Sequence, residues 1–281
     1  MKTAAVVSEI VKTLRRPTRV KALFDPNGRY LLAMRVRGIQ KGFNGRALTD
    51  AKQDGLVRRE YDSYDTYIWH QRSKLDMLQS GGKLGLDGTD LDNYDRKFRE
   101  NLRQRLESLG FIKPGMSALC LAARLGTEVK AFIDCGCFSV GIDLNPGADN
   151  PYVLPGDFHR LVFADDSVDV VYCNALDHAF DLHALLKEVH RVLKPQGRFV
   201  ADVQLGSTES EKRTAGSWES LAWESSSVIT RAFADCGFDI QSTVPFTYPW
   251  RGNCLVAAPT NVAMRDRGHD RPILAQAGGE V

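Results

Sequence analysis

Residues 140–146 read Val-Gly-Ile-Asp-Leu-Asn-Pro, and this stretch decides the predicted fold. Its apolar residues continue a run that begins at Phe138, so they predict a buried strand ending in the single carboxylate of Asp143. The Asn145-Pro146 pair then interrupts the strand. We therefore expect Asp143 at the carboxyl edge of a sheet, where doubly wound α/β folds hold the ribose diol of a nucleotide cofactor.

A second strand and a turn precede this stretch. Residues 117–121 read Ser-Ala-Leu-Cys-Leu, and the turn Ala122–Gly126 leads from them toward a helix predicted over 128–133. Ala122 lies 21 positions before Asp143, the usual span between a cofactor-binding turn and the acid that holds the ribose. The two segments together predict a domain that binds a nucleotide cofactor.

The residues that follow alternate between strand and helix patterns. Further strands are predicted over 167–173, 198–203, 238–242 and 253–258, and further helices over 182–193 and 228–236. Such alternation is typical of a mostly parallel sheet between two helical layers. The predicted fold class is α/β: a doubly wound, mostly parallel, seven-stranded Rossmann-like sheet flanked by helices, over residues 111–259.

Two helices are predicted ahead of the sheet, over 54–78 and 92–109, and residues 56–110 are assigned to a helical cap layer. The second helix has an apolar stripe suited to packing on the sheet. The first carries aromatic and polar residues along one face, where ordinary packing would favour aliphatic side chains. These residues are Tyr61, Tyr64, Tyr67, His70, Gln71 and Lys74. Two interpretations stay open: an amphipathic helix, or the wall of a ligand site.

Positive charge gathers at the N-terminus. Residues 1–55 contain twelve Lys and Arg against four Asp and Glu, although the whole chain has a net charge of only +2. We assign 1–55 to a basic extension and 260–281 to a flexible tail. This charge suggests three functional interpretations: peripheral contact with an anionic membrane surface, contact with nucleic acid, or contact with a phosphorylated acceptor. A solvated extension packed by its apolar face would explain the pattern too. An apolar face there would also suit a homodimer.

Composition narrows the class of protein. A hydrophobic content of 43% and a charged content of 26% are ordinary for a soluble globular protein. No apolar run reaches the roughly 20 residues that span a bilayer, and the first residues lack a secretion signal. A cytoplasmic location is therefore expected, and peripheral attachment at the inner membrane face is a second possibility. Cys135 and Cys137 are too closely spaced for the usual zinc sites, so no metal is expected and the thiols are expected to be reduced.

Four ordered segments resemble the class I S-adenosylmethionine-dependent methyltransferases, in particular the methyltransferase type 11 group that modifies small molecules and sugars. They are the turn Ala122–Gly126, residues 140–146 with Asp143, the pair Gly156-Asp157, and residues 163–171, which read Phe-Ala-Asp-Asp-Ser-Val-Asp-Val-Val. The run Leu-Lys-Pro-Gln-Gly-Arg-Phe over 193–199 continues the resemblance, which covers about residues 110–205. It implies a transferase that uses S-adenosyl-L-methionine.

The resemblance also implies positions for the cofactor. Ala122, Arg124 and Gly126 would lie beside its methionine group, Asp143 and Leu144 beside the ribose, and Asp157 and Phe158 beside the adenine. Asn174 would face the activated methyl, and the first helix would close over the methionine with Tyr64, Tyr67, His70 and Gln71. The sequence departs from the family at Cys120, where an acid is expected, and at Ala122 and Arg124, where glycine is usual.

The acceptor side is predicted from residue chemistry. A hydroxyl acceptor must lose a proton, and an imidazole suits that task near neutral pH. His178 is the candidate base, with Asp177 as the residue that orients it or contacts the substrate; the alternative for His178 is a loop residue that closes the pocket. Trp218, Trp223 and Tyr248 are the candidate substrate contacts.

The favoured function is therefore O-methylation of a hydroxyl on a sugar, a glycan precursor or a secondary metabolite. An RNA or protein methyltransferase that uses the basic N-terminus is an alternative. Nucleic acid is disfavoured because the sequence has no aromatic-rich RNA-binding module and no Asn/Asp-Pro-Pro-aromatic motif after the fourth strand. A non-catalytic binding protein that keeps the fold is a further alternative, suggested by the altered glycine turn.

Overall fold

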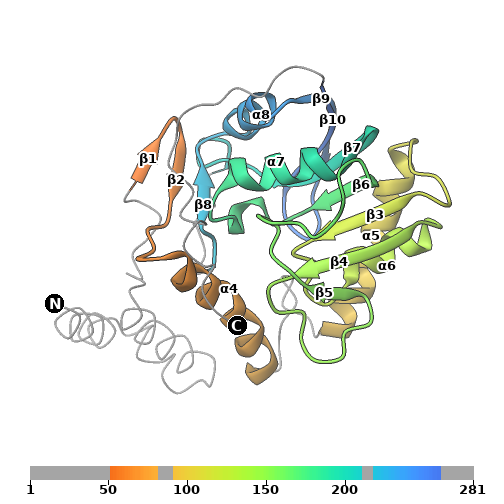
Figure 1. Ribbon diagram of the computed structural model, residues 1–281, viewed down its shortest axis with the longest axis horizontal. Helices are drawn as coiled ribbons and strands as arrows, with labels where there is room; N and C mark the ends of the chain where they lie inside the picture. The colour runs from red at the N-terminus through yellow and green to blue at the C-terminus, as the bar shows by residue number, and fades with distance from the viewer. Residues whose placement is uncertain (1–50, 82–90, 211–217, 261–281) are drawn as a thin grey trace.

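The computed structural model describes residues 51–81, 91–210 and 218–260 of the chain. Most of the predicted basic extension and nearly all of the predicted tail therefore lie outside the described residues. Two sheets and the helices packed on them make up the described part, as Figure 1 shows.

The larger sheet has seven strands. They are β3 (Ser117–Leu121), β4 (Phe138–Asp143), β5 (Val153–Pro155), β6 (Val168–Cys173), β7 (Leu193–Gln204), β9 (Phe238–Phe246) and β10 (Gly252–Pro259). Their order across the sheet is β5-β4-β3-β6-β7-β10-β9. Neighbours from β5 to β7 pair in parallel, whereas β10 runs antiparallel to both β7 and β9. The predicted doubly wound, mostly parallel sheet is confirmed.

Helices cover both faces of this sheet. Helices α7 (Leu182–Val192) and α8 (Ser226–Asp235) lie on one face, and α5 (Leu91–Ser108) and α6 (Thr127–Asp134) lie on the other (Figure 1). Because neither face meets water, the central strands are continuous apolar runs instead of alternating ones. Val170 and Val171 of β6, adjacent in sequence, are both fully buried.

Local sequence signals explain where the helices begin. Asp181 precedes α7, and its carboxylate accepts hydrogen bonds from the backbone N–H groups of His183 and Ala184 at 2.9 and 3.1 Å. This satisfies two donors that the first helical turn would otherwise leave open. The next residues place Leu182, Leu185, Leu186, Val189 and Val192 in the core.

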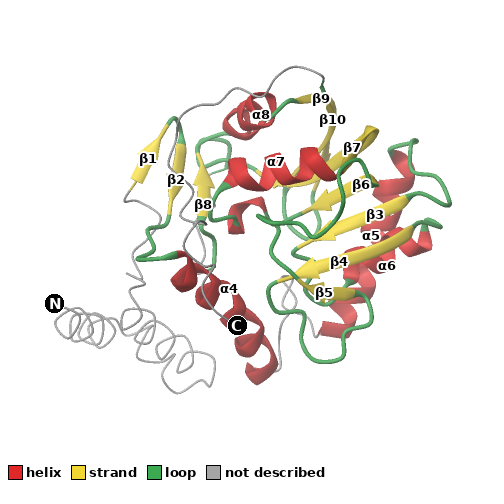
Figure 2. Ribbon diagram, in the orientation of Figure 1, coloured by secondary structure: helices red, strands yellow, loops and turns green. Residues whose placement is uncertain are grey.

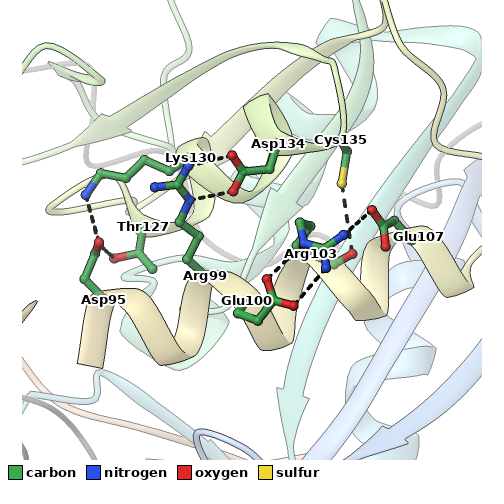
Figure 3. Close-up of polar contacts among 9 residues, drawn as sticks. All are labelled: Asp95, Arg99, Glu100, Arg103, Glu107, Thr127, Lys130, Asp134 and Cys135. Atoms are coloured by element: carbon green, nitrogen blue, oxygen red, sulfur yellow. Dashed lines mark hydrogen bonds and ion pairs between the residues drawn. The ribbon is translucent and has the colours of Figure 1, made fainter. Parts of the chain in front are cut away.

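Charged contacts hold α5 against α6, as Figure 3 shows. Asp95 accepts hydrogen bonds from Thr127 Oγ1 at 2.6 Å and from Lys130 Nζ at 3.0 Å. Arg99 forms a two-pronged ion pair with Asp134, with both N–O distances at 2.5 Å. The first of these contacts matters for the site, because it fixes the N-terminal end of α5 beside the turn that follows β3.

A small antiparallel sheet lies beside the main one. It contains β1 (Ala51–Gln53), β2 (Leu56–Arg58) and β8 (Leu221–Trp223), in that order. Asp54 and Gly55 connect the first two strands with φ values of 51° and 81°, as a two-residue hairpin turn requires. The helix predicted over 54–78 is therefore wrong at its start: α4 spans Tyr64–Gly81. Pairing with β8, far away in the sequence, overrides the local helical pattern.

The order of the strands also creates a ligand-binding position. From β3 the chain winds to one side through β4 and β5, and it then returns to the other side of β3 through β6 and β7. Ligands of open α/β sheets bind where the winding reverses, outside the carboxyl ends of the strands. Figure 2 shows that the arrowheads of β3, β4 and β6 point toward the side on which α4 lies. Among the described residues, no helix has the length and apolar composition needed to cross a membrane.

Candidate active site

A cavity of about 350 Å³ opens at the carboxyl ends of β3, β4 and β6. This volume falls within the usual range of small-molecule sites. Its wall combines the turn after β3, the ends of β4 and β6, the 3₁₀ helix η1 (Leu176–His178), helix α4 and the loop before β10. The predicted site residues on this wall are Tyr67, Gln71, Ala122, Arg124, Asp143, Leu144, Phe158, Asn174, Asp177, His178 and Trp218.

The turn after β3 has the backbone shape of a glycine turn without the glycines. Ala122 and Arg124 adopt φ values of 52° and 42°, in the left-handed region that L residues enter at a cost of about 1 kcal/mol each. Gly126 follows with φ 83° and precedes the first residue of α6. A Cβ atom at Gly126 would lie 2.7 Å from Tyr152 Cβ, so this glycine is needed for space as well as for conformation. The altered sequence thus keeps the path of the turn.

Asp143 ends β4 and reaches across to this turn. Its carboxylate accepts the backbone N–H of Arg124 at 3.0 Å and that of Asn145 at 2.8 Å. Burial raises the pKa of the Asp143 carboxyl, while these two hydrogen bonds oppose the shift. Leu144 continues the wall. The carboxylate is therefore held at the end of the strand, where the sequence places it.

Asn174 directly follows β6 and contacts a buried acid. Its Nδ2 donates to Glu128 Oε1 at 2.9 Å, and both side chains line the cavity. Glu128 lies on the first turn of α6 and is only 8% exposed. Burial raises the pKa of its carboxyl to about 7.

His178 is held by three partners that fix its tautomer. Its Nδ1 lies 3.1 Å from Gln71 Oε1 and 3.0 Å from the carbonyl oxygen of Trp218, and both of these atoms are acceptors. Nδ1 therefore carries the proton, and the lone pair on Nε2 faces Lys74 Nζ at 3.1 Å. Burial, followed by the charge of Lys74, lowers the pKa of His178 well below its usual value.

The pKa of Lys74 is lowered as well. Burial and the nearby charge of Arg124 lower the pKa of its ammonium to about 8, while Asp177, Glu219 and Asp143 partly offset this. Lys74 and His178 thus form a hydrogen-bonded pair in which Lys74 changes its protonation near pH 8 and His178 stays neutral. The predicted partner Asp177 lies 4.0 Å from His178 Nε2, and its Oδ2 accepts from Gln204 Nε2 at 3.1 Å. The Nδ1 contacts with Gln71 and Trp218 orient the imidazole instead.

The start of α4 is tied to the loop after β5. Tyr64 donates its phenolic hydrogen to Asp157, which also accepts from His159 Nδ1 at 2.8 Å. His159 Nε2 in turn accepts the backbone N–H groups of Phe180 and Asp181. The structure places Tyr64 and Asp157 in this network and outside the cavity wall, whereas Phe158 and Tyr67 lie on the wall.

Aromatic side chains form the rest of the enclosure. Trp218 stacks on His70 with ring centroids 5.1 Å apart, and this places Trp218 on the wall while His70 lies behind it. Across the cavity lie Leu91, Tyr94, Pro249 and Trp250. The other two predicted substrate contacts lie elsewhere. Trp223 is buried in β8 and donates to the carbonyl oxygen of Gln204 at 2.9 Å, and the ring of Tyr248 faces Lys97.

Several residues of the wall escaped sequence reasoning. Glu128, Tyr94, Asp95, Gln204 and Glu219 all line the cavity. A signal existed for Glu128, because it is a charged residue on an otherwise apolar helix face that includes Val129 and Phe132. Tyr94 looked like core packing, which it also provides, and nothing local distinguishes Gln204 or Glu219 from surface residues.

Comparisons with known proteins agree with this geometry. A family model described as a methyltransferase domain matches residues 119–201. The demethylmenaquinone methyltransferase of Corynebacterium glutamicum (strain R) is 38% identical over 112 residues, which are 37% of this chain and 46% of the relative. A sterol 24-C-methyltransferase of Gibberella zeae is 28% identical over 124 residues, which are 38% of this chain and 32% of the relative. The chain spans about half the length of the corynebacterial relatives it matches.

A solved structure extends the likeness of the fold. The 1,6-didemethyltoxoflavin-N1-methyltransferase of Burkholderia thailandensis, solved with 1,6-didemethyltoxoflavin and S-adenosylhomocysteine, superposes with a TM-score of 0.55 at 15% identity. The match covers 75% of this chain and 99% of that chain. At this identity the likeness concerns the fold alone.

Proposed function

We propose that this chain, a member of the class I S-adenosylmethionine-dependent methyltransferase superfamily, methylates a hydroxyl group on a small, largely apolar ring molecule. One observation carries the proposal: the acid at the end of β4, a half-buried lysine–histidine pair and an aromatic wall line the same cavity. The acid suits the binding of a nucleoside, the lysine–histidine pair suits a proton transfer, and the aromatic wall suits the binding of a ring.

The residues fit the cofactor of this superfamily. S-adenosylmethionine carries ribose hydroxyls, an adenine ring and a zwitterionic amino acid, and it supplies a methyl group already activated on sulfur. Asp143 would hold the ribose hydroxyls, and Phe158 would lie against the adenine. Arg124 brings positive charge to the same wall for a carboxylate. Asp157 stays a proposal for the adenine amino group, since its present partners are Tyr64 and His159.

The chain's own residues would contribute alignment and exclusion of water. Holding the reacting groups in line removes much of the entropic barrier to a displacement of this kind. Helix α4 closes the cavity with Tyr67 and Gln71, and Trp218 is fixed to it through Gln71 Nε2, which donates to the Trp218 carbonyl oxygen at 2.9 Å. The acceptor would lie between this lid and the wall formed by Tyr94 and Trp250.

The lysine–histidine pair would accept the proton of the acceptor hydroxyl. While Lys74 is an ammonium, it donates to His178 Nε2 and blocks that lone pair. Once Lys74 loses its proton, the pair can take one from a hydroxyl in the cavity. Because the pKa of Lys74 is about 8, this exchange falls within the working range of pH. The catalytic base proposed from the sequence, His178, thus acts together with Lys74.

The lining favours a ring acceptor. Tyr67, Tyr94, Trp218, Trp250 and Phe158 present flat apolar surface to the cavity. Two similar proteins carry the names of demethylmenaquinone and sterol methyltransferases, and both names denote apolar ring compounds. The sugar or glycan acceptor expected from the sequence stays a prediction, and so do the membrane contact, the homodimer and the RNA or protein methyltransferase alternative.

An acceptor screen tests this proposal. The purified chain is incubated with S-adenosylmethionine and one of three acceptor sets: phenols and hydroquinones, free sugars, or short RNA. Formation of S-adenosylhomocysteine is measured by mass spectrometry. We expect product with the phenol or hydroquinone set and background with the other two.

Variants of the pair supply the control. Lys74→Met and His178→Ala should change the rate, whereas Lys113→Met, an exposed lysine far from the cavity wall, should not. Turnover of sugars or RNA at a higher rate than phenols would overturn the acceptor class.

A further inference from the structure

We propose that Glu128 binds the α-ammonium group of S-adenosylmethionine, with Asn174 holding the carboxylate in position. The inference rests on the proposed function and adds to it a residue that neither the sequence pattern nor the comparisons assign.

Glu128 has no ion pair with a side chain, although the charge of Arg124 acts on its carboxylate. The carboxylate is 8% exposed, lines the cavity and receives a hydrogen bond from the neutral amide of Asn174 at 2.9 Å. Among the described residues, its side chain has no lysine, arginine or histidine nitrogen in ion-pairing distance. Buried carboxylates are normally paired with a cation or strongly hydrogen-bonded. A cationic group entering the cavity would supply the missing partner.

Three other carboxylates on the wall already have hydrogen-bond or ion-pair partners. Asp95 is paired with Lys130, Asp143 accepts two backbone N–H groups, and Asp177 accepts from Gln204. Glu219 Oε2 has no hydrogen-bond partner among the described residues, but the charges of Lys74 and Arg59 act on this carboxylate. Glu128, which a neutral amide holds beside the turn that carries Arg124, is placed to gain from a cationic ligand.

The position of Glu128 suits an amino acid group. Glu128 and Asn174 lie by the ends of β3 and β6, next to the turn that carries Arg124. The site thus offers a carboxylate and a guanidinium within one corner, which matches an ammonium and a carboxylate on the same carbon atom. Asp143 lies at the end of the neighbouring strand β4, so nucleoside and amino acid would occupy adjacent parts of the cavity.

Cys120 explains why another acid is needed. This thiol occupies the end of β3 where related enzymes are expected to carry an acid, and it is fully buried with Sγ 3.8 Å from Ser139 Oγ. Burial raises the pKa of the thiol well above its usual value, so Cys120 carries no charge at neutral pH. Glu128, which reaches the cavity from α6, provides the negative charge that the strand lacks.

Calorimetric titration with three ligands tests the assignment. S-adenosylmethionine and S-adenosylhomocysteine carry the amino acid group, whereas 5′-methylthioadenosine keeps the nucleoside and the thioether without it. Wild type, Glu128→Gln and Glu107→Gln are compared at pH 8, the last being an exposed carboxylate of α5 that contacts Arg103. We expect Glu128→Gln to weaken the two amino-acid-bearing ligands at least tenfold and to change methylthioadenosine binding less than twofold. Glu107→Gln should behave as wild type.

The outcomes separate this assignment from the proposed function. Unchanged binding of S-adenosylhomocysteine to Glu128→Gln overturns the role of Glu128 and leaves the proposed function intact. Equal weakening of all three ligands also overturns it, because the effect is then structural. If wild type binds none of the three, the proposed function itself fails and the inference fails with it. Retained methylthioadenosine binding shows that the variant is folded.

Proton release gives a second readout. The pKa of about 7 for Glu128 should fall when an ammonium binds beside it, so binding should release protons near that pH. Titrations at pH 6.5 in two buffers with different ionisation enthalpies measure this number. We expect wild type to release more protons with S-adenosylhomocysteine than with methylthioadenosine, and we expect Glu128→Gln to abolish the difference. An equal release by wild type and variant contradicts the proposal.

Discussion

Replacing Lys74 by methionine is expected to change the pH dependence of methyl transfer. In wild type, the ammonium of Lys74 donates to His178 Nε2 at 3.1 Å and blocks the lone pair that would accept the substrate proton. The rate should therefore follow the neutral fraction of Lys74. The negative charges of Asp177, Glu219 and Asp143 raise the pKa of this ammonium, whereas burial and the positive charge of Arg124 lower it. The lowering effects are larger, so the pKa lies below its usual value.

The expected magnitude follows from the pKa of about 8 for Lys74. The neutral form makes up about a tenth of the molecules at pH 7 and about half at pH 8, so the rate should rise roughly fivefold over this unit and level off above pH 9. In Lys74→Met the lone pair of His178 is no longer engaged, and the pKa of His178 is already depressed by burial. The rate of this variant should therefore be nearly flat from pH 7 to 9.

The assay is formation of S-adenosylhomocysteine at saturating cofactor and acceptor, between pH 6 and 9. Lys74→Arg is the matched variant, because a guanidinium stays protonated over the whole range and should keep the rate low throughout. Acylation of Lys74, followed by mass spectrometry, measures the same ionisation directly. Half-maximal reactivity is expected near pH 8, against about 10.4 for a lysine in a model peptide. A wild-type slope that persists in Lys74→Met would refute the reasoning.

Three further results concern stability. Because burial raises the pKa of Glu128 to about 7, its stabilising contribution is present below its unfolded pKa and is lost as pH rises through 7. Urea unfolding should therefore show that Glu128→Gln stabilises the ligand-free chain by up to about 2–3 kcal/mol at pH 8 and little at pH 4.5. Equal effects at both pH values would contradict this. Ala122→Gly should raise the unfolding free energy by at most about 1 kcal/mol, because the strain relieved at the φ of 52° is partly offset by the greater entropy of the unfolded chain. A lower unfolding free energy in this variant would argue against the left-handed turn. Arg105→Met should cost about 3–5 kcal/mol, because it leaves the fully buried Asp202 without its cation. Arg103→Met, which removes a partly exposed arginine of the same helix, should change the melting temperature little. Similar shifts for both variants would contradict the burial of the Arg105–Asp202 pair.

The parts of the fold that could be predicted are those whose signals are local. The strand ending at Asp143 is an apolar run closed by a turn, and α7 begins at a capping aspartate and repeats its apolar residues at helical spacing. Pairing of β2 with β8 joins segments more than 160 residues apart, and no local pattern in 54–63 reports it. The helix predicted there failed for this reason.

In the candidate site too, local sequence patterns predict some residues, and only packing reveals the others. Asp143, Asn174 and His178 follow predicted strands, so the sheet brings them to one edge. The partners of His178 come from α4 and from the segment before β8, and only their packing shows that Lys74 faces Nε2. Trp223 illustrates the opposite error, because a tryptophan in a polar stretch suggested a substrate loop, yet the residue is a core residue of β8.

Binding of the cofactor underlies every step proposed for this site. Calorimetric titration of S-adenosylmethionine and S-adenosylhomocysteine into the wild-type chain, Asp143→Ala and the exposed control Asp134→Ala measures it directly. We predict micromolar binding of both ligands to wild type and to Asp134→Ala, and a loss of at least tenfold in Asp143→Ala, because the ribose hydroxyls lose a buried acceptor at the end of β4. Absence of binding to wild type, or equal binding to Asp143→Ala, would contradict the assignment of this cavity to the cofactor.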